Sequence, residues 1–218
     1  MTTSNPQKAV HESFAEVIYS TNEMIIAQCY KEDVINKTPQ NTLVQGSVVK
    51  VISSYDNSYV AFGLIAKINN SSLDNIHKPY ALGLSFKELA ELQPQVYDLL
   101  RKELEIYLFA CKEHSNEIFN YPPQKPMMIH DFIQNASEVE IVELTNNFSS
   151  LINLIKRNQL KIDLLFNLIM LGYKLRSYND RYLISIGKEL SLAFSDEVEG
   201  LMQVLKRLSQ SKKSIQIK

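Results

Sequence analysis

The sequence predicts an α+β protein in which a small closed antiparallel β-barrel precedes a mostly α-helical part. Two observations carry this prediction. The first half contains β-rich runs separated by turn-forming residues, whereas apolar residues recur at helical spacing after the proline-rich segment 120–126. The 218 residues, 45% of them hydrophobic and 22% charged, suffice for one large domain or two small ones. We place a β-barrel domain with short helices at 1–119 and an α-helical domain at 120–218.

The clearest β-signal is a hairpin formed by residues 47–53 and 59–68. Both runs are rich in branched or aromatic side chains, and the intervening residues 54–58 (Ser-Tyr-Asp-Asn-Ser) favour a turn. Gly46 and Gly63 stand where a curled sheet must bend or where a second backbone must approach closely. Such a hairpin needs further strands to be stable in water.

Other segments supply candidate strands to close the barrel. Residues 14–20 and 23–30 are expected to form a first hairpin, and a fifth strand is expected from residues 80–84 or later. Residues 69–79 have the composition of a loop. The apolar run 106–111 (IYLFAC) is either the buried end of a helix or a strand, and its β-branched and aromatic content favours the strand. Closure would remove the exposed sheet edges that promote aggregation.

Helix-start signals mark the remaining elements. Ser85 and Ser137 each begin a capping box, which predicts helices to residue 92 and over 138–144. Pro94 is expected to start a second helix, in which apolar residues fall at helical spacing: Val96, Leu99, Leu100 and Leu104. The further expected helices are 148–155, 162–175, 179–194 and 196–208, the last with Ser195 as its N-cap.

No catalytic signature is present. The four histidines lack metal-ligand spacing, and the chain contains no phosphate loop, no dinucleotide-binding fingerprint and no hydrolase elbow. His130-Asp131 has the composition of an oriented imidazole, although such a pair is more often structural. We therefore assign no catalytic, cofactor-binding or metal-binding residue, and we expect no cofactor.

Net charge and cysteine content indicate the kind of partner and the cellular compartment to expect. The formal net charge of -1 provides no bias toward nucleic acid or an anionic membrane. Cys29 and Cys111 each lie in an apolar run, which favours buried reduced thiols over a disulfide. No secretory signal is visible at the N-terminus, and no apolar run approaches the roughly 18 residues that cross a bilayer. These features predict a soluble protein in a reducing compartment with no transmembrane segment.

The densest charged group lies around residues 173–189. We single out its arginines, tyrosines and aspartate as a candidate partner interface, because arginine and tyrosine recur as interface hot spots. An intramolecular salt-bridge cluster that fixes two helices is the alternative, and it is the more common arrangement. The candidate residues are Tyr173, Arg176, Tyr178, Asp180 and Arg181.

Several segments resemble a known family. Residues 14–30, followed by LVQGSVVKV and then FGLIAKI, resemble the HAS barrel, the N-terminal barrel of HerA-type DNA translocases and ATP-synthase catalytic subunits. The run PYALGLSFKELAELQPQVYDLLRKELEIYLFAC, together with YPPQKPMMIHDF and NDRYLISIGKEL, resembles uncharacterised HAS-barrel proteins of cyanobacteria and algal plastids. The resemblance implies an assembly role and a location in the cytoplasm or the plastid stroma. It does not extend to the ATPase domain of the translocases, so motor function is not implied.

Three functions from different classes remain. The first is a non-catalytic adaptor or assembly module that docks onto a larger protein complex or an ATPase ring. The second is a nucleic-acid-associated factor that binds single strands through barrel residues such as Tyr55, Tyr59, Phe62 and Lys67, although no basic cluster surrounds them. The third is an enzyme with an unrecognised site, for example one assembled from the scattered residues His130, Asp131 and Arg181.

Overall fold

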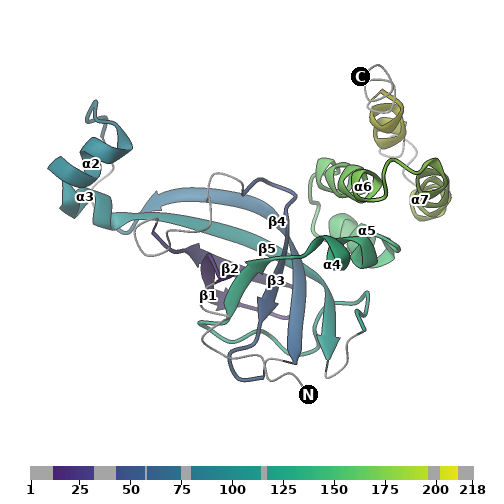
Figure 1. Ribbon diagram of the computed structural model, residues 1–218, viewed down its shortest axis with the longest axis horizontal. Coiled ribbons are helices and arrows are strands. Elements are labelled where there is room, and N and C mark those ends of the chain that lie inside the picture. The colour runs from purple at the N-terminus through teal and green to yellow at the C-terminus, as the bar shows by residue number, and fades with distance from the viewer. Residues whose placement is uncertain are drawn as a thin grey trace.

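The computed structural model describes residues 12–31, 43–56, 58–74, 80–113, 117–195 and 202–210. Within these residues, six strands pair in the order β1-β2-β5-β4-β3-β6 and close into an antiparallel barrel, which helices then cover (Figure 1). The predicted α+β fold class is therefore confirmed. The strands are β1 (Ala15–Ser20), β2 (Met24–Cys29), β3 (Val48–Ile52), β4 (Tyr59–Ser72), β5 (Leu100–Glu113) and β6 (Phe132–Asn135).

Both predicted hairpins are present, but the partner of β4 comes from an unexpected segment. Residues 80–84 form no strand, and β5 begins at Leu100, within the run that we had continued as a helix after Pro94. The pattern of β5 explains the difference. Leu104, Ile106 and Leu108 are fully buried and alternate with half-buried polar or aromatic residues, which is the period of a strand. The strand interpretation of residues 106–111 is confirmed.

A second difference concerns the boundary between barrel and helices. Strand β6 pairs with β1 through Ala15 and Ile133, and with β3 through Val51 and Ile133, so it closes the barrel. It lies beyond residue 119, in the part of the chain that we had assigned to the α-helical domain. Ile133 is fully buried, but a four-residue strand shows too little alternation to be recognised from sequence.

Strand β4 is buried on both faces in its first half. Ala61 and Ile65 belong to the core inside the barrel, whereas Phe62 and Leu64 belong to the core between the barrel wall and the helices. This double burial explains the nearly continuous apolar run of the segment. Gly63 allows the close approach of β5, because a Cβ atom there would lie 2.4 Å from Cγ2 of Ile106. The expected bend at Gly46 is also observed, with a φ of 93°.

The helices form two groups. Helices α2 (Phe86–Leu92) and α3 (Pro94–Leu99) lie between β4 and β5 in sequence, and the others follow β6. Both predicted capping boxes are formed, at Ser85 and at Ser137. Residues 202–210 are helical, whereas the expected N-cap of that helix precedes residues outside the described part of the chain. The helices after β6 are α4 (Glu138–Leu144), α5 (Ser149–Arg157), α6 (Asp163–Leu175) and α7 (Asp180–Ala193).

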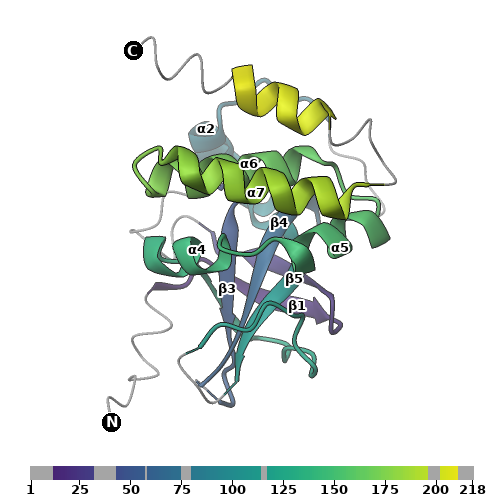
Figure 2. The ribbon, with the colours of Figure 1, turned by 90° about the vertical axis from the view of Figure 1, so that its right-hand side faces the viewer.

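These later helices cover one side of the barrel (Figure 2). Their buried residues form one hydrophobic core with the outward-facing side chains of β3, β4 and β5. Polar contacts reinforce the attachment. Lys50 on β3 forms an ion pair of 3.2 Å with Glu140 on α4, and the Ser150 hydroxyl on α5 donates a hydrogen bond of 2.7 Å to the carbonyl oxygen of Phe109 on β5.

Candidate functional site

Arg176, one of the predicted interface residues, lies in an intramolecular network at the junction of α4, α6 and α7. Its guanidinium donates hydrogen bonds to the Thr145 hydroxyl at 2.8 Å, and to the Val142 carbonyl and the Asn146 side chain at 2.6 Å each. It also lies 4.3 Å from the centre of the Tyr182 ring, a cation–π distance. These contacts match the alternative interpretation, in which the charged group fixes helices to one another.

The other four residues of this set divide into two kinds. Tyr173 is buried and donates a hydrogen bond of 2.9 Å to Asp180, and its ring packs edge-on against Tyr178 at 5.3 Å. Burial and the bond to Asp180 raise the pKa of Tyr173 above its ordinary value. Tyr178 and Arg181 are exposed. Asp180 is exposed as well, so partner binding at this junction stays a prediction, with Tyr178, Asp180 and Arg181 as its accessible members.

The candidate pair His130 and Asp131 does not form one site. Asp131 is fully buried and accepts hydrogen bonds from the Ser54 backbone N–H at 2.6 Å, from the Ser54 hydroxyl at 2.7 Å and from a further backbone N–H at 2.7 Å. His130 is exposed, and its Nδ1 lies 2.9 Å from a carboxylate oxygen of Glu16. The third residue, Arg181, lies on α7. Asp131 therefore acts as a structural anchor between two loops of the barrel.

The aromatic residues proposed for single-strand binding also serve packing. Phe62 is fully buried under the helices, and the Tyr59 hydroxyl donates a hydrogen bond of 3.0 Å to the Lys125 carbonyl. Tyr55 and Lys67 are exposed, but Tyr55 lies in the turn before β4 and Lys67 lies far along that strand. The four side chains do not line a shared groove, although nucleic-acid binding elsewhere on the surface stays a prediction.

The two cysteines behave as expected for buried thiols. Both are free and buried, in agreement with the prediction. Burial raises the pKa of Cys29 to about 11 and that of Cys111 to about 12, which keeps both thiols protonated and unreactive near neutral pH. Among the described residues, no group of three or more His, Cys, Asp or Glu side chains could hold a metal ion.

The feature that sequence reasoning missed is an arm formed by β4 and β5. The two strands remain paired as far as Ser72 and Leu100, whereas β4 last pairs with β3 at Leu64 and β5 last pairs with β2 at Glu103, and the arm extends away from the barrel (Figure 1). Residues 69–72, predicted to be loop, form its β4 side. The polar sequence Asn-Asn-Ser-Ser has low strand propensity, and it forms a strand through its pairing with residues 100–103 of β5.

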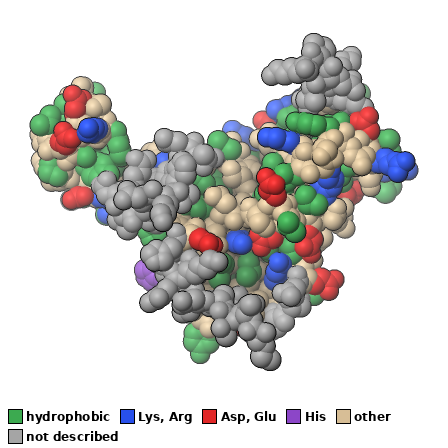
Figure 3. Space-filling model, viewed as in Figure 1, with side chains coloured by type: hydrophobic (Ala, Val, Ile, Leu, Met, Phe, Trp, Pro, Cys, Tyr) green, Lys and Arg blue, Asp and Glu red, His purple; other side chains and the backbone are tan. Residues whose placement is uncertain are grey.

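The tip of the arm consists of residues 80–99, which include helices α2 and α3, and it carries exposed apolar side chains. Helix α2 has no buried residue, and Tyr97 is the buried residue of α3. Figure 3 shows hydrophobic side chains on the surface of this tip, among acidic and basic ones. Four large apolar side chains of the tip are exposed to solvent and are not packed into a core, with these exposed fractions: Tyr80 79%, Phe86 56%, Leu92 63% and Leu99 36%.

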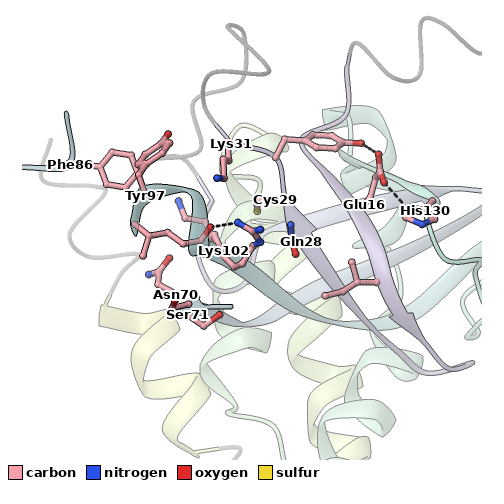
Figure 4. Close-up of a pocket in the computed structure, with 15 residues that line it drawn as sticks. Glu16, Gln28, Cys29, Lys31, Asn70, Ser71, Phe86, Tyr97, Lys102 and His130 are labelled. Carbon is pink, nitrogen blue, oxygen red and sulfur yellow. Dashed lines mark hydrogen bonds and ion pairs between the residues drawn. The ribbon is translucent and has the colours of Figure 1, made fainter. Parts of the chain in front are cut away.

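A groove of about 1120 Å³ lies between the base of this arm and strands β1 and β2 (Figure 4). Lys31, at the end of β2, braces one side of it. The Lys31 ammonium contacts the Asp98 carboxylate at 2.9 Å and lies 5.2 Å from the centre of the Tyr97 ring. Arg101 donates hydrogen bonds to the carbonyl oxygens of Asp98 and Leu100, at 2.7 and 2.8 Å. The Lys31–Asp98 ion pair therefore joins the barrel to the arm across the groove, and the Arg101 hydrogen bonds lie within the arm.

On the opposite side of the groove, Glu16 joins a tyrosine and a histidine. The Tyr30 hydroxyl donates a hydrogen bond of 2.5 Å to one carboxylate oxygen of Glu16, and the other oxygen contacts His130 (Figure 4). Burial and the Glu16 carboxylate both raise the pKa of Tyr30, so its hydroxyl remains protonated at neutral pH.

Comparison with known proteins supplies no function for the chain, so a function has to be argued from the geometry above. Neither a scan against models of known protein families nor a search of curated proteins finds a match to the chain. The described helices include none that is both long enough and apolar enough to span a membrane. By its structure, the chain is an α+β protein with a closed β-barrel, a helical covering layer and an apolar-tipped arm.

Proposed function

We propose that this protein is a non-catalytic adaptor or assembly module that docks onto a larger protein complex through its arm. The observation that carries the proposal is the arm's tip, where Phe86 and Leu92 are exposed on a helix that has no buried residue. No residue of helices α2 and α3 belongs to either hydrophobic core of the described structure. A projecting element that the fold does not require is well suited to contact another molecule.

The energetic argument supports a protein partner. Burying a leucine or phenylalanine side chain is worth about 1.5–3 kcal/mol, and the tip offers several such side chains on one small element. Large exposed apolar patches on soluble proteins commonly mark interaction sites. Exposed aromatic residues such as Tyr80 and Phe86 would act as anchors, because aromatic side chains dominate many interface hot spots.

The finer parts of this proposal come from the resemblance in sequence. A closed antiparallel barrel is compatible with kinship to HAS-barrel proteins, which supports a role in assembling a complex or ring. Free, buried thiols agree with a reducing compartment, and we propose the cytoplasm or a plastid stroma. The exposed pair Tyr178 and Arg181 is a second candidate contact for the same partner.

The direct test is affinity capture from the native organism, with a variant that changes only the tip. We expect wild-type protein to retain a defined set of partner proteins and the double variant Tyr80→Ser, Leu92→Ser to lose them. The matched control is Ile184→Ser, Leu192→Ser, which removes two exposed apolar side chains from α7 instead. All three proteins should have the same melting temperature, because none of the four side chains is buried.

Two outcomes would count against the proposal. If the tip variant captures the same partners as wild type while the α7 control loses them, the docking surface lies on the helical layer. If wild-type protein captures nothing and sediments as a monomer, the adaptor function itself fails.

A further inference from the structure

Lys102 lines the groove, and no described residue supplies a partner for its positive charge. Its side chain is half-buried, and it forms no ion pair or hydrogen bond with another residue in the described ranges. It lies close enough to Cys29 for its charge to lower the pKa of that thiol in part, against the larger effect of burial. An ammonium on the wall of a groove that no carboxylate of the described residues pairs with can form charge-assisted hydrogen bonds with an anion, so an anion is the expected ligand beside it.

The register of the arm shows where this ammonium lies. Lys102 occupies the same face of β5 as Leu104 and Ile106, which line the barrel interior, and it stands directly across from Asn70 on β4. The inner face of the barrel thus continues outward as a polar surface once β2 has ended. Lys102 and Asn70 stand at the mouth of the barrel, where a ligand in the groove would meet them.

Further polar groups of the groove are available to a ligand. The side chains of Gln28, Asn70 and Ser71 form no hydrogen bond with another described residue, although each lines the groove. Arg101 uses one nitrogen for its two backbone bonds and retains free N–H donors. A phosphate group has the several acceptor oxygens that such a set of donors requires.

An aromatic surface lies at the arm side of the same groove. Phe86 packs edge-on against Tyr97, with ring centres 5.1 Å apart and planes at 65°, and more than half of Phe86 is exposed. A planar ring can stack on its free face. The groove therefore combines a site for phosphate, at Lys102, with a site for a flat ring, at Phe86, as a nucleotide requires.

The carboxylates nearby already have partners and do not neutralise Lys102. Asp98 forms its ion pair with Lys31, and Glu16 accepts from Tyr30 and contacts His130. Their presence instead limits what can bind. With Glu103 and Glu105 following along β5 and a net charge of -1, no continuous basic track exists for a nucleic-acid strand.

We propose that the groove at the base of the arm binds a free nucleotide, with its phosphate on Lys102 and Arg101 and its base on Phe86. The volume of about 1120 Å³ accommodates a molecule of this size. The groove shares Phe86 with the docking surface proposed above but includes neither Tyr80 nor Leu92, so the variant Tyr80→Ser, Leu92→Ser tests docking alone and Lys102→Ala tests nucleotide binding alone. The two ideas can fail separately.

The test is isothermal titration calorimetry of the full chain with ADP. We expect saturable binding with one site per chain. Lys102→Ala should weaken binding about tenfold or more, because it removes a charge-assisted contact. Phe86→Ala should weaken ADP binding about tenfold and leave the weaker binding of inorganic phosphate unchanged. Lys67→Ala, which removes an exposed lysine from the neighbouring strand, and the tip variant Leu92→Ser should both bind ADP as wild type does.

Three results would overturn the proposal. The first is that the protein, shown to be folded by a cooperative melting curve, binds no ADP up to millimolar concentration. The second is ADP binding that Lys102→Ala and Lys67→Ala weaken equally, which would indicate non-specific charge attraction. The third is tighter binding of a short oligoadenylate than of ADP, which would assign the groove to single strands instead.

Discussion

The body of the barrel and the tip of the arm contain the same kinds of residue in opposite environments. Phe62 and Phe86 illustrate the difference. Phe62, on β4, is fully buried between the barrel wall and the helices, whereas Phe86, at the end of the arm that β4 builds, is 56% exposed. The fold uses apolar side chains to hold the body together, but it leaves those of the tip uncovered. This contrast separates the part of the sequence that stabilises the fold from the part that is free to bind.

The largest expected effect comes from truncating these two phenylalanines in turn. Phe62→Ala should lower the free energy of unfolding by about 3–5 kcal/mol, since it removes a buried ring and leaves a cavity. Phe86→Ala should change it by less than about 0.5 kcal/mol. Urea denaturation followed by far-ultraviolet circular dichroism measures both values. Equal losses would mean that the tip is part of the cooperative core.

A second pair compares carboxylates in the two regions. Asp131→Ala should destabilise the protein by about 2–3 kcal/mol, because it removes a fully buried carboxylate that accepts three hydrogen bonds from the loops of the barrel. Asp98→Ala removes an exposed ion pair at the base of the arm, which is worth about 0–1 kcal/mol. Thermal melting of both variants is the measurement. A stable Asp131→Ala protein would contradict the anchoring role.

The sequence predicted the body of the protein far better than the arm. The hairpins at β1–β2 and β3–β4 and the capping boxes at Ser85 and Ser137 have local signals, because each element is determined by residues close together in the chain. The arm has no such signal. Its β4 end, Asn69–Ser72, pairs with residues about 30 positions away, and only the β-branched and aromatic content of residues 106–111 indicated that its partner is a strand.

The candidate site was predicted less well than the fold. Arg176 and Tyr173 were singled out as candidate partner contacts, with an intramolecular cluster as the more common alternative, and the structure uses both within the helical junction. Charge density alone does not distinguish a side chain that faces outward from one that hydrogen-bonds a neighbouring helix. Lys102 was overlooked for the converse reason, because a lysine beside glutamates in sequence is expected to be a solvated residue.

The helical junction supplies a third prediction. Arg176→Ala should lower the free energy of unfolding by about 1–3 kcal/mol, because several acceptors on α4 and α6 lose their donor. Arg181→Ala, on the exposed surface of α7, should change it by less than about 0.5 kcal/mol. Denaturant titrations test both. If Arg176→Ala melts as wild type and loses a captured partner, the residue belongs to an interface instead.

The smallest effect concerns pH and the two capping boxes. Burial tends to raise the pKa of Glu140, but hydrogen bonds from Ser137 and the charge of Lys50 outweigh it and hold the pKa below the ordinary value of 4.5. The ionised Glu140 carboxylate therefore stabilises the fold above pH 4.5, and this contribution to the free energy of unfolding is lost as the pH falls through the lower pKa of the folded state.

This pH dependence also distinguishes the body from the tip. Glu140→Gln should reduce the free energy of unfolding at pH 7 and converge with wild type in acid. Glu88→Gln in the matching box of α2 should have no measurable effect on global unfolding, because α2 contributes no buried residue. Urea titrations at a series of pH values provide the comparison. A loss at Glu88 equal to that at Glu140 would show that the two boxes are equally coupled to the fold.

Hydrogen–deuterium exchange read out by mass spectrometry tests most directly whether the tip is held exposed for a partner. In the free protein, we expect amides of α2 and α3 to exchange far faster than those of β4 between Tyr59 and Leu64, which open only on global unfolding. In the affinity-captured complex, the same α2 and α3 amides should become protected. Protection that appears on α7 or the barrel while the tip stays unchanged would contradict the proposal.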